Sequence, residues 1–187
     1  MAPVYVLDAC VLYPVVLRDL LLTLATLDAF EPRWTDAIID EMTRNVLADR
    51  PDIEPSKFEE GVIGAMRRAF PAGSVEGYEH LIGDMDNHPK DRHVAAAAVH
   101  VGAAAVVTYN VRDFDSELLR QRRIAIVTPP RLVGQLVDDE PSVVSLAVWS
   151  MAARKKRPPM SPAEAVAAIV RQQGFGALED SLHDLVD

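Results

Sequence analysis

The stretch VYVLDAC, residues 4–10, places an aspartate directly after a short apolar run. Val4–Leu7 is almost wholly apolar, which is typical of a strand buried on both faces of a parallel sheet. Asp8 follows at the point where such a strand leaves the core. A carboxylate there is costly unless it is hydrated, hydrogen-bonded or bound to a cation. Asp8 therefore either caps the local backbone or forms part of a site.

Further short apolar runs predict the rest of the sheet. They lie near Arg33–Trp34, at Ala105–Tyr109 and at Ile124–Val127, with a weak additional candidate near Val75. Helical patterns fill the intervals between these runs: Pro14–Leu27, a helix from the N-cap Thr35 to about Leu47, and the alanine-rich His93–Val101, which ends at Gly102. Strands that alternate with helices predict an α/β fold with a parallel sheet.

The pattern changes after Thr128, where Pro129 and Pro130 interrupt it and no strand signal follows. Helical patterns cover 131–138 and 142–156. The sequence SPAE, residues 161–164, is a capping box with proline at the first helical position, and it predicts a helix that ends before residue 174. A last short helix is expected from about residue 177. The sequence thus predicts a domain over 1–130 and a small all-helical extension over 131–187.

Composition narrows the class of protein. Hydrophobic residues make up 49% and charged residues 25% of the chain, which is typical of a soluble globular protein. Cys10 is the single cysteine, and there is no secretory signal and no apolar run of the roughly 20 residues that a membrane span needs, so we expect a cytoplasmic protein without membrane contact. The net charge of −9 argues against coating of nucleic acid by bulk charge, but not against binding through local arginines or metal ions.

Acidic residues follow or flank several of the predicted strands. Ligands of parallel α/β sheets bind at the carboxyl ends of the strands. Asp8 lies at that end of the first strand, and Asp113 lies just past Ala105–Tyr109. Asp91 precedes the alanine-rich helix, on the side from which such helices begin. We therefore expect these three carboxylates to converge.

Glu41 is the fourth candidate, in the helix that begins after Thr35. At about 100° per residue, one face of this helix carries an apolar stripe. The stripe consists of Ile38, Ile39, Met42 and Val46. Glu41 falls on the flank of the stripe and can reach the crevice, whereas Asp40 is expected to face water.

Each acid also has a purely structural interpretation. Asp8 could cap a turn, Asp91 could cap its own helix, and either Asp113 or Asp115 could cap a short helix near 117–122. Packed together, however, unpaired carboxylates would repel one another, and some would take up protons. Mg²⁺ or Mn²⁺ would remove that repulsion, activate water, and stabilise charge on a phosphoryl group.

Four segments resemble the acidic motifs of PIN-domain nucleases, in order and at suitable spacing: VLDACVLYP, DEMTRN, KDRHVAAAA and VVTYNVRDF. The longer segments LDACVLYPVVLRDLLLTLA and PRWTDAIIDEMTRN are most similar to VapC-type toxins of bacterial toxin–antitoxin pairs. The resemblance covers about residues 1–130. It implies a PIN-like parallel sheet with helices on both faces and an endoribonuclease that uses Mg²⁺ or Mn²⁺ to hydrolyse RNA. It also implies a cognate antitoxin as partner and a homodimer.

The resemblance implies roles for individual residues. The catalytic and metal-binding acids of the family match Asp8, Glu41, Asp91 and Asp113 of this chain. Asp115 stays open as an alternative fourth acid. Thr108 and Asn110 match a polar pair that supports the metal ligands or the substrate. Arg112 lies close to the motif, where it could contact a phosphate or form a structural ion pair.

Two other classes of function compete with this interpretation. Response-regulator receivers and haloacid-dehalogenase-type phosphatases also place an aspartate after the first strand. The chain lacks the lysine that receivers carry after the last strand, and Cys10 stands where the phosphatases carry a second aspartate. The remaining alternative is a catalytically inactive PIN fold that binds RNA or protein. The basic run RKKR, residues 154–157, further predicts that the helical extension binds RNA phosphates or an acidic antitoxin segment.

Overall fold

A computed structural model describes residues 2–186 of the chain. These residues form two compact units. The first unit comprises the residues up to Tyr13 together with Phe30–Val127. The second comprises Pro14–Ala29 together with the residues from Thr128 onward. The predicted boundary between a domain over 1–130 and a helical extension over 131–187 stays a prediction.

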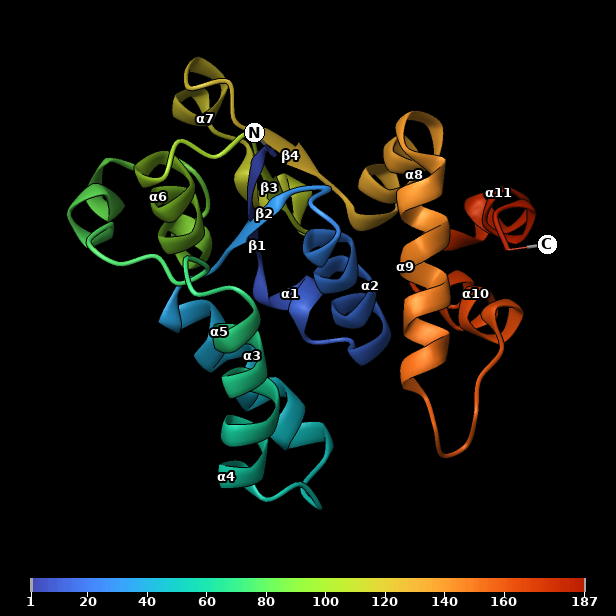
Figure 1. Ribbon diagram of the computed structural model, residues 1–187. Coiled ribbons are helices and arrows are strands. Elements are labelled where there is room, and N and C mark those ends of the chain that lie inside the picture. Colours follow the sequence, from blue (N-terminus) through green and yellow to red (C-terminus); the bar gives the residue numbers. More distant parts are fainter. Residues whose placement is uncertain (1, 187) are drawn as a thin grey trace. The chain divides into compact units, whose positions relative to one another are not determined.

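The first unit is built on a parallel sheet (Figure 1). Within residues 2–186 the sheet has four strands, β1 (Val4–Leu7), β2 (Glu31–Arg33), β3 (Ala105–Val107) and β4 (Ala125–Val127), in the order β2-β1-β3-β4. All pairings are parallel. The predicted α/β fold is confirmed. The weak candidate near Val75 is not a strand, because Ser74 forms only an isolated bridge to Trp34.

Burial explains the strand order. The central strands β1 and β3 carry the most apolar runs, and Val6, Leu7, Val106 and Val107 are fully buried. The edge strand β2 contains Pro32, which lacks a backbone N–H and is therefore tolerated at a sheet edge. The carboxyl ends of β1 and β3 lie side by side, since Leu7 pairs with Val107. This edge of the sheet is where the sequence places its acids.

Helices flank the sheet of the first unit. The α-helices are α1 (Ala9–Leu12), α3 (Asp36–Asp49), α4 (Pro55–Phe58), α5 (Gly64–Ala69), α6 (Arg92–His100) and α7 (Glu117–Gln121). A π-helical turn, η1 (Glu59–Ile63), joins α4 to α5, and 3-10 helices form η2 (Glu79–Asp84), η3 (Pro89–Asp91) and η4 (Val111–Phe114). The alanines of α6 are buried, which lets this helix pack closely on β1 and β3. Gly102 follows α6 with φ +60°, as expected of a C-terminal glycine.

The second unit is entirely helical (Figure 1). Its helices are α2 (Val15–Thr26), α8 (Pro129–Asp139), α9 (Pro141–Arg154), α10 (Pro162–Val170), the 3-10 helix η5 (Phe175–Leu178) and α11 (Glu179–Asp184). The predicted capping box is present: Glu164 N–H donates to Ser161 Oγ, and Ser161 N–H donates to Glu164 Oε2. Pro129 and Pro130 do not break the chain pattern but begin α8, since proline fits the first turn of a helix.

The central helix of this unit is α9, which packs against α2, α8 and α10. Its buried face carries Val144, Ala147, Val148 and Met151. The predicted C-terminal helices after the last strand are thus confirmed. Over the described part of the chain, no helix combines the length and the apolar character that a membrane crossing requires.

Candidate functional site

Asp8 connects the end of β1 to the start of α1. Its N–H donates to Val107 O at 3.1 Å, which continues the ladder of the sheet. Its carboxylate then caps α1, with Oδ1 accepting from Ala9 N at 2.7 Å. Oδ2 accepts from Thr108 Oγ1 at 2.6 Å, and Asp8 is only 4% exposed. Asp8 therefore caps the backbone and at the same time contacts the neighbouring strand end.

Thr108 is the residue through which the ends of β1 and β3 are joined. Its side chain is fully buried. Its hydroxyl donates to Asp8 and accepts from Asn110 N–H at 2.9 Å. Asn110 is exposed, and its carbonyl accepts from Asp113 N–H at 2.9 Å, which begins the turn of η4. The polar pair Thr108 and Asn110 thus sets the position of Asp8 and the path of the chain toward Asp113.

Cys10 packs against the same carboxylate. Its thiol donates to Asp8 Oδ2 at 3.2 Å, and its sulfur accepts from Tyr109 N–H at 3.4 Å. Burial, reinforced by the negative charge of Asp8, raises the pKa of the Cys10 thiol to about 12. A thiol with this pKa stays protonated at neutral pH and is a poor nucleophile. Cys10 is therefore a packing and hydrogen-bonding partner of Asp8.

Asp91 lies at the junction of η3 and α6 and is 5% exposed. It occupies the N-cap position of α6, yet within residues 2–186 its side chain makes no capping hydrogen bond. Burial raises the pKa of Asp91, and the negative charges of Asp8 and Asp113 raise it further, while Lys90 and His88 lower it. The negative charges of Asp8 and Asp113, from two other segments, thus act on Asp91, although burial is the larger cause of its raised pKa.

Glu41 lies on α3 with the predicted orientation. The apolar stripe is buried, Asp40 is exposed, and the side chain of Glu41 is 25% exposed. Glu41 Oε1 lies 3.5 Å from Lys90 Nζ, one residue before Asp91. The structure thus links Glu41 to the segment that carries the third acid, through a lysine rather than through direct contact of carboxylates.

The two candidates for the fourth acid differ in their surroundings. Asp113 is half-buried, its carbonyl accepts from His88 N–H at 2.9 Å, and its charge acts on Asp91. The side chain of Asp115 is 79% exposed and pairs with Arg120 at 2.5 Å. The geometry therefore favours Asp113. Neither aspartate caps α7, because Ser116 Oγ accepts from Leu119 N–H at 3.1 Å.

Sequence reasoning missed the loop that holds Asp91. Asn87 is buried, and its Nδ2 donates to Asp113 O at 3.2 Å. His88 Nδ1 lies 3.6 Å from Asp91 Oδ2, and Lys90 bridges toward Glu41. The polar segment NHPKD, residues 87–91, was the available signal. Its residues bring two cationic or protonatable groups to the acids.

The donor set fits a hard divalent cation in its chemistry. Carboxylate oxygens are the ligands that Mg²⁺ and Mn²⁺ prefer, and the pKa of Asp91 is raised first by burial and then by the charges of Asp8 and Asp113, whose repulsion a cation would relieve. Among residues 2–186, however, no three or more His, Cys, Asp or Glu side chains stand close enough together to hold a metal ion as placed. Lys90, whose Nζ lies 3.5 Å from Glu41 Oε1, instead supplies a nearby positive charge.

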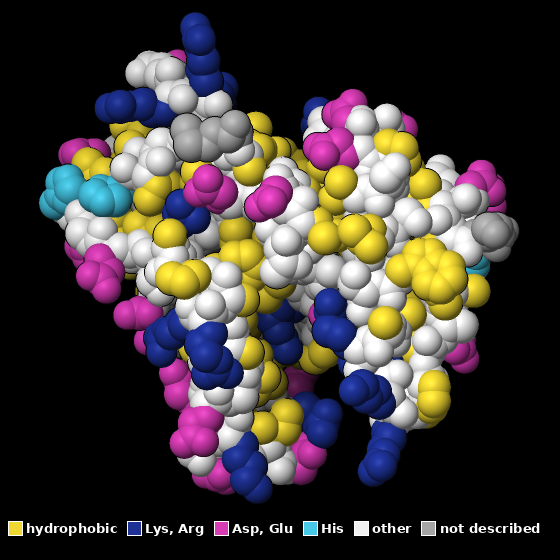
Figure 2. Space-filling view, in the orientation of Figure 1, with side chains coloured by type: hydrophobic (Ala, Val, Ile, Leu, Met, Phe, Trp, Pro, Cys, Tyr) yellow, Lys and Arg dark blue, Asp and Glu magenta, His cyan; other side chains and the backbone are white. Residues whose placement is uncertain are grey.

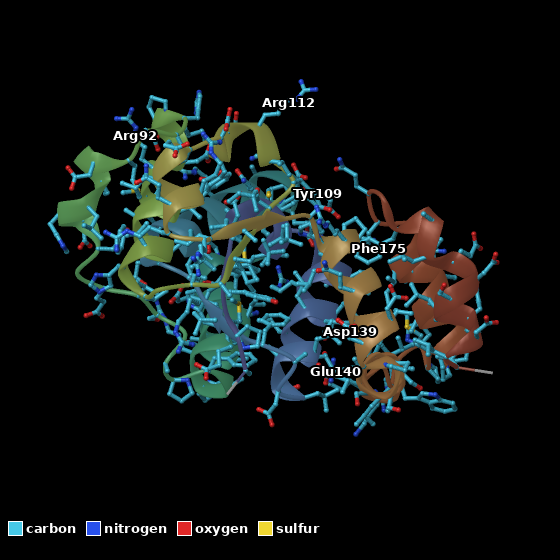
Figure 3. All side chains as sticks on the ribbon, turned by 90° about the horizontal axis from the view of Figure 1, so that it is seen from above. Arg92, Tyr109, Arg112, Asp139, Glu140 and Phe175 are labelled. Atoms are coloured by element: carbon cyan, nitrogen blue, oxygen red, sulfur yellow. The ribbon has the colours of Figure 1, made fainter. Side chains whose placement is uncertain are left out.

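Arg112 extends from η4 on the outer side of the acids. Figure 3 shows its side chain pointing away from the ribbon of the first unit. Within residues 2–186 its guanidinium makes no ion pair and no side-chain hydrogen bond, and the residue is exposed. Arg92 also lies at the rim in Figure 3, but its Nε donates to Asn87 O at 3.2 Å. Arg112 is thus an exposed cation, without an ion pair in the described part of the chain, that is available to a phosphate.

Comparison with known proteins identifies one distant relative. The chain is similar to a protein of Mycobacterium tuberculosis (strain H37Rv) named "Putative ribonuclease VapC50", with 32% identity over 96 residues. The match covers 51% of this chain and 57% of that protein, so the chain spans little more than half the length of the curated relative it matches. No protein-family profile and no solved structure matches the chain. The resemblance to VapC-type proteins is confirmed at this distance.

Proposed function

We propose that this chain is a metal-dependent endoribonuclease of the VapC type, the toxin of a toxin–antitoxin pair, which hydrolyses RNA phosphodiester bonds. Two observations support the proposal. The relative carries the name "Putative ribonuclease VapC50". Asp8 is buried at the end of β1, where it is bonded to Thr108 just after β3, and the negative charges of Asp8 and Asp113 act on the buried Asp91. This electrostatic coupling among the acids is the observation that carries the proposal.

In this proposal Asp8, Glu41, Asp91 and Asp113 hold Mg²⁺ or Mn²⁺. When bound, such an ion lowers the pKa of water and stabilises negative charge on a phosphoryl group. Asp8 is held in place by its bonds to Ala9 and Thr108 and is therefore oriented before any ligand arrives. No side-chain nucleophile is required, which agrees with the protonated state of the Cys10 thiol.

The remaining residues bind and orient the RNA. The exposed guanidinium of Arg112 contacts a phosphate of the RNA strand. Thr108 holds the Asp8 carboxylate by a hydrogen bond, and the N–H of Asn110 in turn holds the Thr108 hydroxyl. Lys90, which faces Glu41, exchanges this pairing for a substrate phosphate. A cognate antitoxin and a second copy of the chain are the protein partners that the VapC resemblance implies.

The direct test is cleavage of a structured RNA by the purified chain without antitoxin. Cleavage is expected with Mg²⁺ or Mn²⁺ and is expected to stop with EDTA. The variant Asp8→Asn keeps the shape of the side chain and removes one charge from the acids, so it should not cleave. Cleavage that continues in EDTA, or that Asp8→Asn leaves intact, would contradict the proposal.

The competing function is a catalytically inactive module that binds RNA or protein. The placement of the acids favours this alternative, because within residues 2–186 no three His, Cys, Asp or Glu side chains lie close enough together to bind a metal ion. RNA binding without cleavage under every divalent cation tested would select this alternative.

A further inference from the structure

An open pocket of about 540 Å³ lies in the first unit beside η4, the 3-10 helix that carries Asp113. Its volume falls within the roughly 300–1,000 Å³ of pockets that hold small ligands. The walls come from η4, from α7 and from the edge strand β4. The pocket therefore adjoins the acids through one short helix.

The pocket presents apolar surface to solvent. Phe114 and Leu119 are buried and form part of its lining. Val111, at the start of η4, is 41% exposed, and Ala125 of β4 is exposed as well. Single exposed apolar residues are ordinary, but here the exposed Val111 joins a concave apolar lining two residues before Asp113. This combination fits a flat apolar ligand group that enters from solvent.

Two arginines, Arg112 and Arg120, line the same pocket, together with the carboxylate of Asp115. Arg120 is neutralised by Asp115 and Glu117, whereas Arg112 has no ion pair within residues 2–186. Figure 2 shows the dark blue Lys and Arg side chains that project over α7. Arg112 therefore leaves one unpaired positive charge beside the pocket, which is suited to a phosphate group.

We propose that the pocket binds an unpaired nucleobase of the RNA strand whose phosphate contacts Arg112, and so selects the nucleotide that stands beside the acids. The inference rests on the proposed function for its substrate class. Proteins read single-stranded RNA by placing splayed-out bases in pockets, with cations along the backbone. An apolar pocket flanked by a free guanidinium supplies both parts of that recognition.

Binding of short RNA tests the pocket without requiring cleavage. The parent for this test is Asp8→Asn with Mg²⁺, and the probes are fluorescein-labelled single-stranded heptamers of each of the four nucleotides and an abasic strand of equal length. Fluorescence anisotropy gives the affinities. At least one base-containing strand should bind about tenfold more tightly than the abasic strand, as expected from burial of a base.

Two substitutions should reduce this ratio. Ala125→Ile fills the pocket from β4 with a residue that suits a strand, and it should bring the ratio to about 2 or below. Val111→Ser removes apolar wall from η4, and it should lower the ratio about threefold. Arg112→Ala should weaken binding of both strands equally, because it removes a phosphate contact. The exposed Val15 of the second unit provides the matched control, Val15→Ser, which should change nothing.

The outcomes separate the pocket from the catalytic proposal. Equal binding of base-containing and abasic strands by the parent overturns the inference. A ratio unchanged in Ala125→Ile and in Val111→Ser also overturns it, as would be seen if the pocket took a protein side chain instead. Melting temperatures check folding, and Val111→Ser keeps the test decisive if Ala125→Ile fails to fold. If the parent binds base-containing strands more tightly but the wild-type chain cleaves no RNA, the proposed function is refuted and the inference about the pocket stands.

Discussion

Replacing Thr108 by valine isolates the hydroxyl that joins the two strand ends. Valine keeps nearly the same shape, so the packing of this fully buried residue is preserved. The change removes the 2.6 Å bond to Asp8 and the 2.9 Å bond from Asn110 N–H. A hydrogen bond to a charged group contributes roughly 1.5–3 kcal/mol, whereas the N–H of the exposed Asn110 can turn to water. We expect the free energy of unfolding to fall by about 2–3 kcal/mol.

Urea denaturation followed by circular dichroism at pH 7, without divalent cations, measures this loss. Thr108→Ser serves as the control, because it keeps the hydroxyl and loses only a methyl group, for about 1 kcal/mol. The double variant with Asp8→Asn should show a coupling of about 1–2 kcal/mol between the two sites. A loss below about 0.5 kcal/mol in Thr108→Val, or strict additivity in the double variant, would refute the argument that this bond holds the Asp8 carboxylate.

Three further perturbations test the acids and the second unit. Asp91→Asn should raise stability at neutral pH without metal. The pKa of Asp91 is raised by folding, so ionisation of this carboxyl destabilises the folded state increasingly as the pH rises from its ordinary pKa to the raised pKa. In urea denaturation at a series of pH values, the gain should therefore vanish below the ordinary carboxyl pKa. Glu41→Gln should abolish RNA cleavage while the exposed Asp40→Asn keeps it, and the reverse result in a gel assay would show that the orientation of α3 does not select the functional acid. Arg154→Ala should lower the free energy of unfolding by about 1 kcal/mol, because it removes the 2.7 Å ion pair with Asp19. Alanine at positions 155–157 should leave the free energy of unfolding unchanged and weaken only the binding of RNA or antitoxin.

The elements that follow from local chemistry were predictable from the sequence. The apolar run of β1, the Thr35 cap and the orientation of Glu41 all depend on residues close to one another in the chain, and the structure agrees with each of them. The strand expected to reach Tyr109 ends at Val107, because the Thr108 side chain turns toward Asp8 and the chain then enters η4.

The features that the sequence missed depend on contacts between distant segments. Lys90 meets Glu41 only because the loop before α6 folds toward α3, and no periodicity reports such a contact. Asp113 and Asp115 are two residues apart, so spacing could not separate them, whereas the turn of η4 sends one toward Asp91 and the other toward Arg120. Arg154, the first residue of the predicted binding run, pairs with Asp19 of α2, a contact that the sequence did not indicate.

The burial of Cys10 beside Asp8 has a practical consequence for measuring motion at the acids. Because its pKa is raised to about 12, the Cys10 thiol is almost entirely protonated at pH 8. Alkylating reagents attack the thiolate, so the closed protein reacts extremely slowly. Reaction becomes fast when the segment around Asp8 opens and the thiol regains an ordinary acidity. Because Cys10 is the single cysteine of the chain, its alkylation rate reports how often the ends of β1 and β3 separate.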